Sequence, residues 1–310
     1  MNYLSRLSGK IKFDESLKSR STFKIGGRAR IWFEPDSIND LCSAVKVARD
    51  KKIPVLIIGA GSNILVAKKK INVMVINLNA KEFKRIEFGK QIVDCGAGVK
   101  LSFLIKKAAS CDLGGLEFLS GIPATVGGAL SMNAGISFKI PAAPGERKSN
   151  KLRLANIANL LEDITVMTYR GIIRRINKKD LIFGYRRSNL SKYIILSARF
   201  KLIKKTKKQI KEDIKEYLVY RRRTQDLRFA SLGCIFKNPK SNISAGRLID
   251  LCGLKGKMIG DACISEKHAN FILNKGNAKA GDVLRLIRFI KKKVRNKFNI
   301  VLTPEIKIWN

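Results

Sequence analysis

The sequence predicts an α+β fold divided into two domains. The chain has 310 residues, about twice the usual length of one domain. In its first half, β-branched apolar runs of strand length alternate with amphipathic helical stretches and glycine-bearing turns. A long lysine-rich helix over 206–223 separates this half from the rest. We therefore expect one domain over 20–203 and a second over 204–310.

The individual elements follow from hydrophobic periodicity. Helices are predicted where apolar residues recur every three or four positions, and strands where β-branched residues run together. Gly171 is the expected turn of a hairpin, and Asn277 is a candidate cap for the last helix. The predicted strands are 53–58, 73–78, 164–169, 172–176, 194–202 and 303–309, and the predicted helices are 41–51, 101–109, 206–223, 245–252 and 280–297.

The charge of the chain is strongly positive. Its 63 lysines and arginines exceed its 24 aspartates and glutamates by 39. Such a charge attracts nucleic acid, acidic membranes and phosphorylated metabolites alike. However, the basic residues are spread along the chain, and short runs such as 291–293 fit solvated helix faces best. No specific nucleic-acid partner is predicted, because no binding motif and no interleaved aromatic residues accompany these runs.

Several classes of protein are excluded. Residues 1–21 lack the apolar core of a secretory signal, and no run approaches the ~20 apolar residues of a membrane span. We therefore expect a cytoplasmic protein without membrane insertion. The six cysteines form no C-x-x-C pair, which indicates free thiols. His268 is the only histidine and fits a structural role best, so no metal site is predicted.

A glycine-rich turn follows the first of the predicted strands. Two glycines let backbone amides converge on an anion such as a pyrophosphate, and two polar side chains can add donors. The dinucleotide-binding fingerprint of doubly wound sheets is not met, because Ile64 stands at its third glycine position. Taken alone, the turn also fits an ordinary hairpin. Its residues are Gly59, Ala60, Gly61, Ser62 and Asn63.

A second glycine-rich segment, SGIPATVGGALSMNAG, covers 120–135. Its four glycines let a flat ligand or a diphosphate lie against the backbone, with Ser120 and Thr125 as donors. Lysine and arginine are absent from 113–137, which indicates close packing around an uncharged ring system. The alternative is a turn whose glycines serve helix packing. The candidate binding residues are Gly121, Ile122, Thr125, Gly127 and Gly128.

The order of these motifs resembles the UDP-N-acetylenolpyruvoylglucosamine reductase family. The similar segments are STFKIGGRA at 21–29, the two glycine-rich segments, FGYRRS at 183–188, GCIFKNP at 233–239, AGRLID and GLKG within 245–256, 265–274, and LTPE at 302–305. The resemblance runs from about residue 20 to residue 308. It implies an FAD-binding domain of the para-cresol methylhydroxylase type and a C-terminal α+β substrate-binding domain, in the family's shorter subtype.

The resemblance implies a flavoenzyme of peptidoglycan precursor synthesis. NADPH reduces FAD, and the enolpyruvyl ether of a UDP-sugar is then reduced to the lactyl ether of UDP-N-acetylmuramate. The implied partners are therefore the UDP-sugar substrate and NADPH, and we expect a monomer. A second hypothesis is another FAD oxidoreductase of the same fold that acts on a sugar or lactone. The motifs of the second half argue against it.

The resemblance also assigns catalytic roles. Arg186 and Glu305 match the positions that stabilise the negatively charged intermediate of the reduction. Cys234 falls at the position of the proton donor, which is usually a serine. A thiol, with an ordinary pKa of about 8.5, is a stronger acid than a hydroxyl, so the replacement keeps the role. A buried apolar thiol is the structural alternative for Cys234.

Four further residues match positions near the substrate. Tyr185, Lys237 and Asn238 are expected to contact the sugar nucleotide, and Lys255 its diphosphate, with a solvated lysine as the alternative. Some positions depart from the family pattern. Ala124 replaces a common loop glycine, 136–139 replaces a small Tyr-Gly-containing stretch, and Asp226 and Ala230 stand where prolines are common.

The positive charge generates a first prediction. Both NADPH and a UDP-sugar are anionic, so the field of the chain should speed their capture. Because the Debye length is only about 10 Å at 0.1 M salt, raising the salt should lower kcat/KM for both substrates. Steady-state kinetics over a salt series at constant pH checks this, and a kcat/KM that does not change with salt would contradict it.

Overall fold

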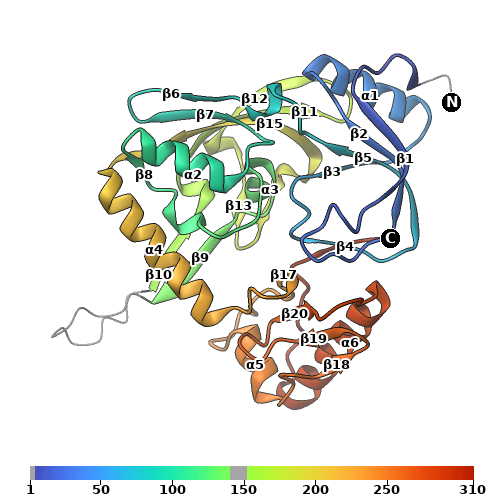
Figure 1. The fold of residues 1–310 in the computed structure, drawn as a ribbon, viewed down its shortest axis with the longest axis vertical. Coiled ribbons are helices and arrows are strands. Elements are labelled where there is room, and N and C mark those ends of the chain that lie inside the picture. The colour runs from blue at the N-terminus through green and yellow to red at the C-terminus, as the bar shows by residue number, and fades with distance from the viewer. Residues whose placement is uncertain (1–3, 140–151) are drawn as a thin grey trace. The chain divides into compact units, whose positions relative to one another are not determined.

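The computed structural model describes residues 4–139 and 152–310. The chain forms two compact units, each built from separate stretches of sequence (Figure 1). Stretches of the first 80 residues contribute to both units, so the units interleave along the chain. The domain boundary near residue 203 stays a prediction. Unit 1 contains Met1–Ser8, Pro35–Val47 and Leu78–Val219, and unit 2 contains Gly9–Glu34, Ala48–Asn77 and Tyr220–Asn310.

A mixed four-stranded sheet begins unit 2. The strands lie in the order β1 (Lys10–Ser16), β2 (Arg28–Glu34), β5 (Lys70–Asn77) and β3 (Val55–Ile58). β1 is antiparallel to β2, whereas β2, β5 and β3 are parallel to their neighbours. Parallel strands need a crossover connection, and α1 (Ile38–Asp50) follows β2 and precedes β3 in the chain. Trp32, Ile71 and Val75 belong to the apolar cluster of this sheet.

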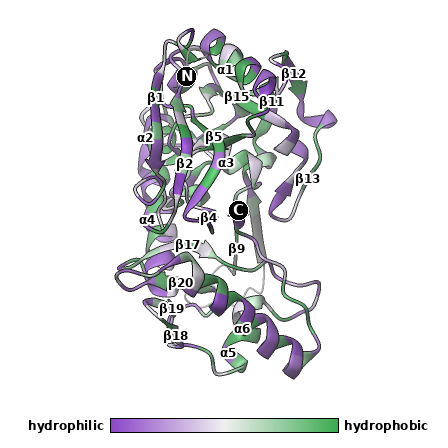
Figure 2. Ribbon diagram, turned by 90° about the vertical axis from the view of Figure 1, so that its right-hand side faces the viewer, coloured by the Kyte–Doolittle hydropathy of each residue, from purple (hydrophilic) through white to green (hydrophobic). Residues whose placement is uncertain are grey.

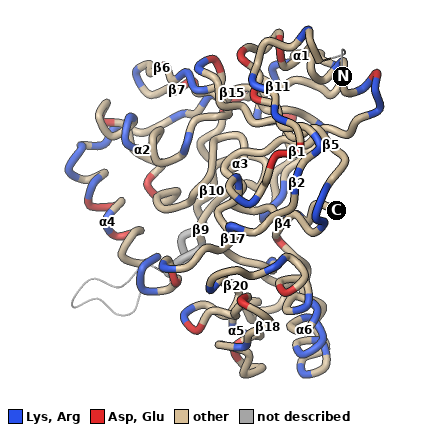
Figure 3. The backbone as a smooth tube through the Cα atoms, turned by 45° about the vertical axis from the view of Figure 1, so that its right-hand side comes forward, with Lys and Arg blue, Asp and Glu red and all other residues tan. Residues whose placement is uncertain are grey.

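The C-terminal part of unit 2 is an antiparallel sheet with two helices. Its strands lie in the order β17 (Ala230–Cys234), β20 (Phe271–Asn274), β19 (Ala262–Ile264) and β18 (Met258–Ile259). The helices are α5 (Ala245–Leu251) and α6 (Ala280–Phe298). Figure 2 shows apolar and polar positions alternating along α6, whose buried residues recur at helical spacing. Its lysines and arginines appear as blue segments in Figure 3.

The apolar core of unit 2 includes residues from the first 70 positions of the chain. Phe23 and Leu65 are fully buried together with Phe236 and Ile264. In addition, β4 (Ile64–Val66) pairs in parallel with β21 (Lys307–Trp309). Residues from the first 70 positions and residues from the C-terminal part of the chain thus share one hydrophobic core.

Unit 1 is built on an antiparallel five-stranded sheet. The order is β12 (Ile173–Asn177), β11 (Leu161–Thr168), β15 (Tyr193–Lys201), β7 (Ile92–Gly96) and β6 (Ile86–Phe88). Its pairs are all antiparallel, and Ile164, Ile194 and Phe200 are fully buried in it. The other elements are α2 (Leu101–Ser110), α3 (Val126–Ser131), α4 (Lys207–Thr224), and the strand pairs β8 (Leu113–Gly114) with β16 (Ile203–Lys204), β9 (Gly135–Lys139) with β10 (Leu152–Asn156), and β13 (Phe183–Gly184) with β14 (Arg187–Ser188).

The predicted elements are present, with two corrections at element ends. Asn277 does not cap α6, because the helix begins at Ala280 and its N-cap is Lys279, whose amide donates to the carboxylate of Asp282 (2.9 Å). The amide of Asn277 instead donates to Asp261 (2.8 Å). The last strand begins at Lys307 rather than at residue 303, because Pro304 has no N–H to contribute to a sheet. None of the described helices is long and apolar enough to cross a membrane.

Candidate active site

The first glycine-rich turn, between β3 and β4, is shaped by a close backbone contact. Gly61 has φ +64°, and a Cβ atom at this position would lie 2.1 Å from the carbonyl oxygen of Arg20. The carbonyl of Gly61 accepts hydrogen bonds from Ser21 Oγ (3.2 Å) and from the amide of Thr22 (3.4 Å). Glycine is therefore required at residue 61 by backbone conformation and by space.

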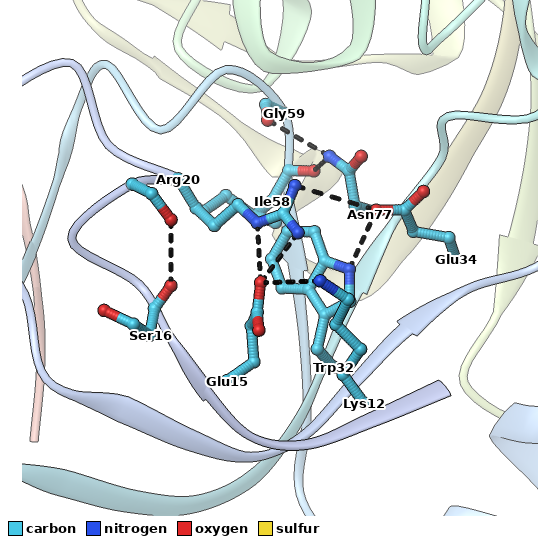
Figure 4. A network of polar contacts seen from close by, with 10 residues as sticks. Lys12, Glu15, Ser16, Arg20, Trp32, Glu34, Ile58, Gly59 and Asn77 are labelled. Carbon is cyan, nitrogen blue, oxygen red and sulfur yellow. Dashed lines mark hydrogen bonds and ion pairs between the residues drawn. The ribbon is translucent and has the colours of Figure 1, made fainter. Parts of the chain in front are cut away.

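Arg20, whose carbonyl faces Gly61, has its side chain held by an ion-pair network. Figure 4 shows this network. The guanidinium lies 4.4 Å from the centre of the Trp32 ring and contacts Glu15 at 2.7 and 3.1 Å. Burial alone would raise the pKa of the Glu15 carboxyl, but the Arg20 guanidinium holds it below its usual value. Trp32 in turn donates to Glu34 (2.9 Å). The side chain of Arg20 is thus fixed from two sides.

The polarity of the turn suits an anion. Asn77 donates to the carbonyls of Ile58 (2.8 Å) and Gly59 (3.2 Å). By contrast, the amides of residues 60–63 donate no hydrogen bond within residues 4–139 and 152–310. Amides without a protein acceptor in a glycine turn are the kind of donor that a phosphate group needs. The turn therefore fits the pyrophosphate of the expected FAD.

Asn63 joins the turn to the end of the chain. Its Nδ2 donates to the carbonyl of Glu305 (3.3 Å), and its own carbonyl accepts from the amide of Lys307 (2.9 Å). These two bonds extend the pairing of β4 with β21 by one position. The structure thereby brings the turn and Glu305 together across 242 residues of sequence.

Cys234 ends β17 at an irregularity of the sheet. Gly233 has φ +75°, and the register between β17 and β20 shifts between Ser231 and Cys234. Such a bulge re-aims the side chain that follows it. The amide of Glu305 donates to the carbonyl of Ile235 at 2.7 Å. Cys234 and Glu305 therefore come from neighbouring backbone segments of unit 2.

The thiols of the chain differ in exposure. Cys234 is only partly buried, whereas Cys95 is buried, and burial raises the pKa of the Cys95 thiol. Cys95 lies in the central part of the sheet of unit 1 and fits a structural role. Cys234 retains the solvent access that a residue in contact with substrate requires.

Asn270 fixes the segment that follows Cys234, a role that sequence reasoning missed. The side chain is 3% exposed. Its Oδ1 accepts from the amide of Phe236 (2.9 Å), and its Nδ2 donates to the carbonyl of the same residue (2.8 Å). The side-chain amide thus pairs with the backbone as a neighbouring strand would. An asparagine inside an apolar run was the available signal.

Three of the four residues expected near the substrate lie in unit 2. Lys237 is half-buried and donates its amide to the carbonyl of Thr303 (2.9 Å), beside Glu305. Asn238 is exposed and accepts from the amide of Ala245 at the start of α5 (3.0 Å). Lys255 is exposed, and its Nζ lies 3.1 Å from a carboxylate oxygen of Asp250. Lys237 is therefore the one of the three that the backbone joins to the Glu305 segment.

Arg186 lies in unit 1, at the tip of the β13–β14 hairpin. Gly184 pairs with Arg187, which leaves Tyr185 and Arg186 as the two residues of the turn. Arg186 has φ +52°, a conformation that is uncommon outside glycine. Its guanidinium lies 5.5 Å from the centre of the Tyr185 ring, and Tyr185 is 52% exposed. The two-residue turn requires this backbone conformation of Arg186.

The second glycine-rich segment, also in unit 1, serves packing in part. Thr125 caps α3 by accepting from the amide of Gly128 (3.3 Å). The amide of Gly127 donates to the carbonyl of Ala97 (2.9 Å), and a Cβ atom on Gly127 would lie 3.0 Å from the Ala97 side chain. The amides of both glycines are thus used by the fold. Gly121, with φ +78°, shapes the loop before α3.

One feature of this loop fits a ligand. The hydroxyl of Ser120 is buried and has no hydrogen-bond partner in the described part of the chain, so it is able to donate to a bound group. Ala124, where the family has a glycine, donates its amide to the carbonyl of Ile122 (2.9 Å) and accepts from Leu101 (3.0 Å). Its backbone bonds show that alanine fits the loop.

The other departures from the family pattern are also accommodated. Asp226 accepts from the guanidinium of Arg228 (2.9 Å), which lowers the pKa of the Asp226 carboxyl. Ala230 begins β17 opposite Asn274. The stretch 136–139 lies in β9, whose backbone pairs with β10.

Two family models and several known proteins match the chain. Residues 225–309 match the family model for the C-terminal domain of UDP-N-acetylenolpyruvoylglucosamine reductase, and residues 29–144 match that of an FAD binding domain. The reductase of that name from Agathobacter rectalis is 39% identical over 95% of this chain and 92% of its own length. The one from Desulforamulus reducens is 37% identical over 98% and 95%.

A solved structure agrees with these relatives. The crystal structure of UDP-N-acetylenolpyruvylglucosamine reductase from Thermus caldophilus matches with a TM-score of 0.77 and 34% sequence identity. The match covers 98% of this chain and all of that one. The α+β fold with an FAD-binding domain and a C-terminal domain is therefore confirmed.

The geometry of the first turn generates a second prediction. We expect Gly61→Ala to weaken FAD binding by roughly 10-fold to 10²-fold, because alanine is strained at positive φ and its methyl would meet the Arg20 carbonyl. Fluorescence titration of the apoprotein with FAD measures the Kd. Gly281→Ala is the control, since no atom lies within 4 Å of the added methyl. An unchanged Kd for Gly61→Ala would contradict the prediction.

Proposed function

The chain belongs to the UDP-N-acetylenolpyruvoylglucosamine reductase family, and we propose that Arg186, Cys234 and Glu305 carry the chemistry of its reaction. The protein is an FAD-dependent oxidoreductase of peptidoglycan precursor synthesis. With NADPH as reductant, it converts the enolpyruvyl ether of UDP-N-acetylglucosamine enolpyruvate to UDP-N-acetylmuramate. The observation that best supports the residue roles is the backbone bond between the Cys234 and Glu305 segments.

The chemistry defines what these side chains must do. When bound, FAD would supply the chemistry of hydride transfer from NADPH to the methylene carbon of the enolpyruvyl group. The electron pair of the double bond then moves to the adjacent carbon and is delocalised into the substrate carboxylate. A proton delivered to that carbon completes the reduction. The protein therefore needs a fixed cation and a proton donor.

Arg186 is proposed as the cation. A guanidinium stays charged at every pH at which the enzyme works, and its planar fork matches both oxygens of a carboxylate. The turn of the hairpin holds Arg186 in one backbone conformation. A cation held in place before the reaction stabilises developing charge without reorganisation.

Cys234 is proposed as the proton donor, with Glu305 beside it. The thiol gives its proton to the carbon that carries the negative charge, and solvent replaces that proton after product release. A carboxyl group stabilises negative charge only when it donates a hydrogen bond from its protonated form. The hydrogen bond between the Glu305 amide and the Ile235 carbonyl holds these two groups on adjacent segments.

The remaining site residues are proposed as binding groups. The turn of residues 59–63 supplies amides to the pyrophosphate of FAD, and Gly121, Ile122, Thr125, Gly127 and Gly128 shape the backbone against which the flavin lies. Lys237 and Asn238 are proposed to bind the sugar nucleotide, as is Tyr185, which is 52% exposed. Lys255 is proposed for the diphosphate, in exchange for its contact with Asp250.

The alternative flavin oxidase is not favoured. The C-terminal family match covers residues 225–309, which contain both Cys234 and Glu305. An oxidase of free sugars would share only the FAD-binding domain.

We propose that the enzyme acts as a monomer in the cytoplasm. None of the six cysteines, all of which lie in the described ranges, forms a disulfide, and this is the expected state in a reducing compartment. Light scattering of the holoenzyme and fractionation of cells test the two parts of this proposal separately.

A pair of substitutions tests the role of Cys234. Cys234→Ser replaces the S–H donor with an O–H donor and should keep activity within about tenfold of the wild type. Cys234→Ala has no donor and should lose activity by roughly 10²-fold to 10⁴-fold. The measurement is the rate at which substrate oxidises the reduced flavin in a single turnover. Equal rates in the two variants would exclude Cys234 as the proton donor.

A further inference from the structure

The hairpin that carries Arg186 is bonded to a buried amide side chain. Asn133 follows α3, is 7% exposed and has φ +43°. Its Nδ2 donates to the carbonyl of Gly184 at 3.1 Å, and its Oδ1 accepts from the amide of Ala158 at 3.4 Å. Gly184 is the residue directly before the two-residue turn. The contact of Asn133 is therefore made two residues from Arg186.

The other strand of the hairpin is hydrogen-bonded to the C-terminal end of α3, close to Asn133. Ser188 Oγ donates to the carbonyl of Ser131 at 2.8 Å, and Ser131 is the last residue of α3. Ser131 and Asn133 are two residues apart. The C-terminal end of α3 thus holds both strands of the hairpin, one through Gly184 and one through Ser188.

The hydrogen bonds at Gly184 and Ser188 hold a turn that contains a residue in an uncommon backbone conformation. Arg186 has φ +52°, and a residue other than glycine keeps such a conformation only where its surroundings enforce it. The bonds at Gly184 and Ser188 flank the strained residue on both sides. Loss of either bond should let the turn relax and move the guanidinium.

We propose that Asn133 is a positioning residue that sets the place of the Arg186 guanidinium for the substrate carboxylate. The inference rests on the proposed function of Arg186. Asn133 acts through the backbone of Gly184 and not on the reacting atoms. An amide side chain can donate to one backbone carbonyl through its nitrogen and accept from another backbone amide through its oxygen, and asparagine tolerates positive φ.

The substitution Asn133→Asp isolates this role. Aspartate keeps the size, the tolerance of positive φ and the acceptor for Ala158, but it removes the donor to Gly184 and places a carboxylate oxygen against a carbonyl. The matched control is Asn274→Asp. Asn274 is 6% exposed and donates to the carbonyl of Phe23 at 3.1 Å, within unit 2. The control therefore loses the same kind of buried donor away from the hairpin.

The experiment separates the two half-reactions of the holoenzyme by rapid mixing. Reduction of the flavin by NADPH does not involve the substrate carboxylate, so Asn133→Asp should stay within about twofold of the wild type in this step. Oxidation of the reduced flavin by the UDP-enolpyruvyl sugar should slow by roughly 10-fold to 10²-fold, the effect of a misplaced group. The control should slow neither step. Equal slowing of both steps by Asn133→Asp would overturn the proposal.

A second readout does not depend on activity. Hydrogen exchange of residues 182–189 should become faster in Asn133→Asp and stay unchanged in Asn274→Asp. Unchanged exchange in both variants would overturn the proposal. If Asn133→Asp yields no holoenzyme, Ser188→Ala removes the second bond to α3. It should then show the same split between the half-reactions, and a uniform effect on both would overturn the proposal.

A double variant distinguishes this inference from the proposed function. If Arg186→Ala oxidises its reduced flavin at the wild-type rate, the proposed role of Arg186 fails. If Arg186→Ala is slow, adding Asn133→Asp should slow it no further, because Asn133 acts through Arg186. A further slowing by the factor seen in the single variant would overturn the inference and leave the proposed function standing.

Discussion

The parallel pairing of β4 with β21, extended by Asn63, is the interaction on which the candidate site in unit 2 depends. The glycine-rich turn directly precedes β4, and Glu305 lies two residues before β21, the strand that pairs with it. One short ladder therefore links the proposed anion-binding turn to the segment of a proposed catalytic carboxyl. The bond from Glu305 to the carbonyl of Ile235 extends this connection to Cys234. Three stretches far apart in sequence thus share one backbone framework.

Three of the proposed functional residues share a second property, which is an unusual backbone at the residue or directly beside it. Gly61 and Arg186 have positive φ, and Cys234 directly follows Gly233, which has φ +75°. Each departure is supported by contacts that regular structure does not need, such as the ion-pair network of Arg20 and the amide of Asn133. Local conformations that are unfavourable by themselves are kept where function requires a fixed geometry. By comparison, most of the net charge of +39 lies outside these contacts, as the basic residues along α4 and α6 show (Figure 3).

Local patterns predicted much of the fold, because helices such as α2 and α6 carry apolar residues at helical spacing. The motifs also predicted the family, and the turn after β3 leads into a strand, which agrees with the dinucleotide-binding fingerprint being unmet at Ile64. The partners of Asn133 and Asn270 could not be predicted, because they lie 51 and 34 residues away. Asn277 was wrong as a cap, because α6 begins at Ala280 and its N-cap is Lys279. The interleaving of the two units depends on packing of distant stretches, which periodicity does not encode.

The central claim is that this chain couples oxidation of NADPH to reduction of an enolpyruvyl sugar nucleotide through one bound flavin. An anaerobic titration of the purified holoenzyme, followed by its visible absorbance, tests this most directly. One equivalent of NADPH should bleach the flavin, and one equivalent of UDP-N-acetylglucosamine enolpyruvate should then restore the oxidised spectrum and yield UDP-N-acetylmuramate. A flavin that stays reduced in the presence of this substrate, or a protein that binds no FAD, would contradict the account.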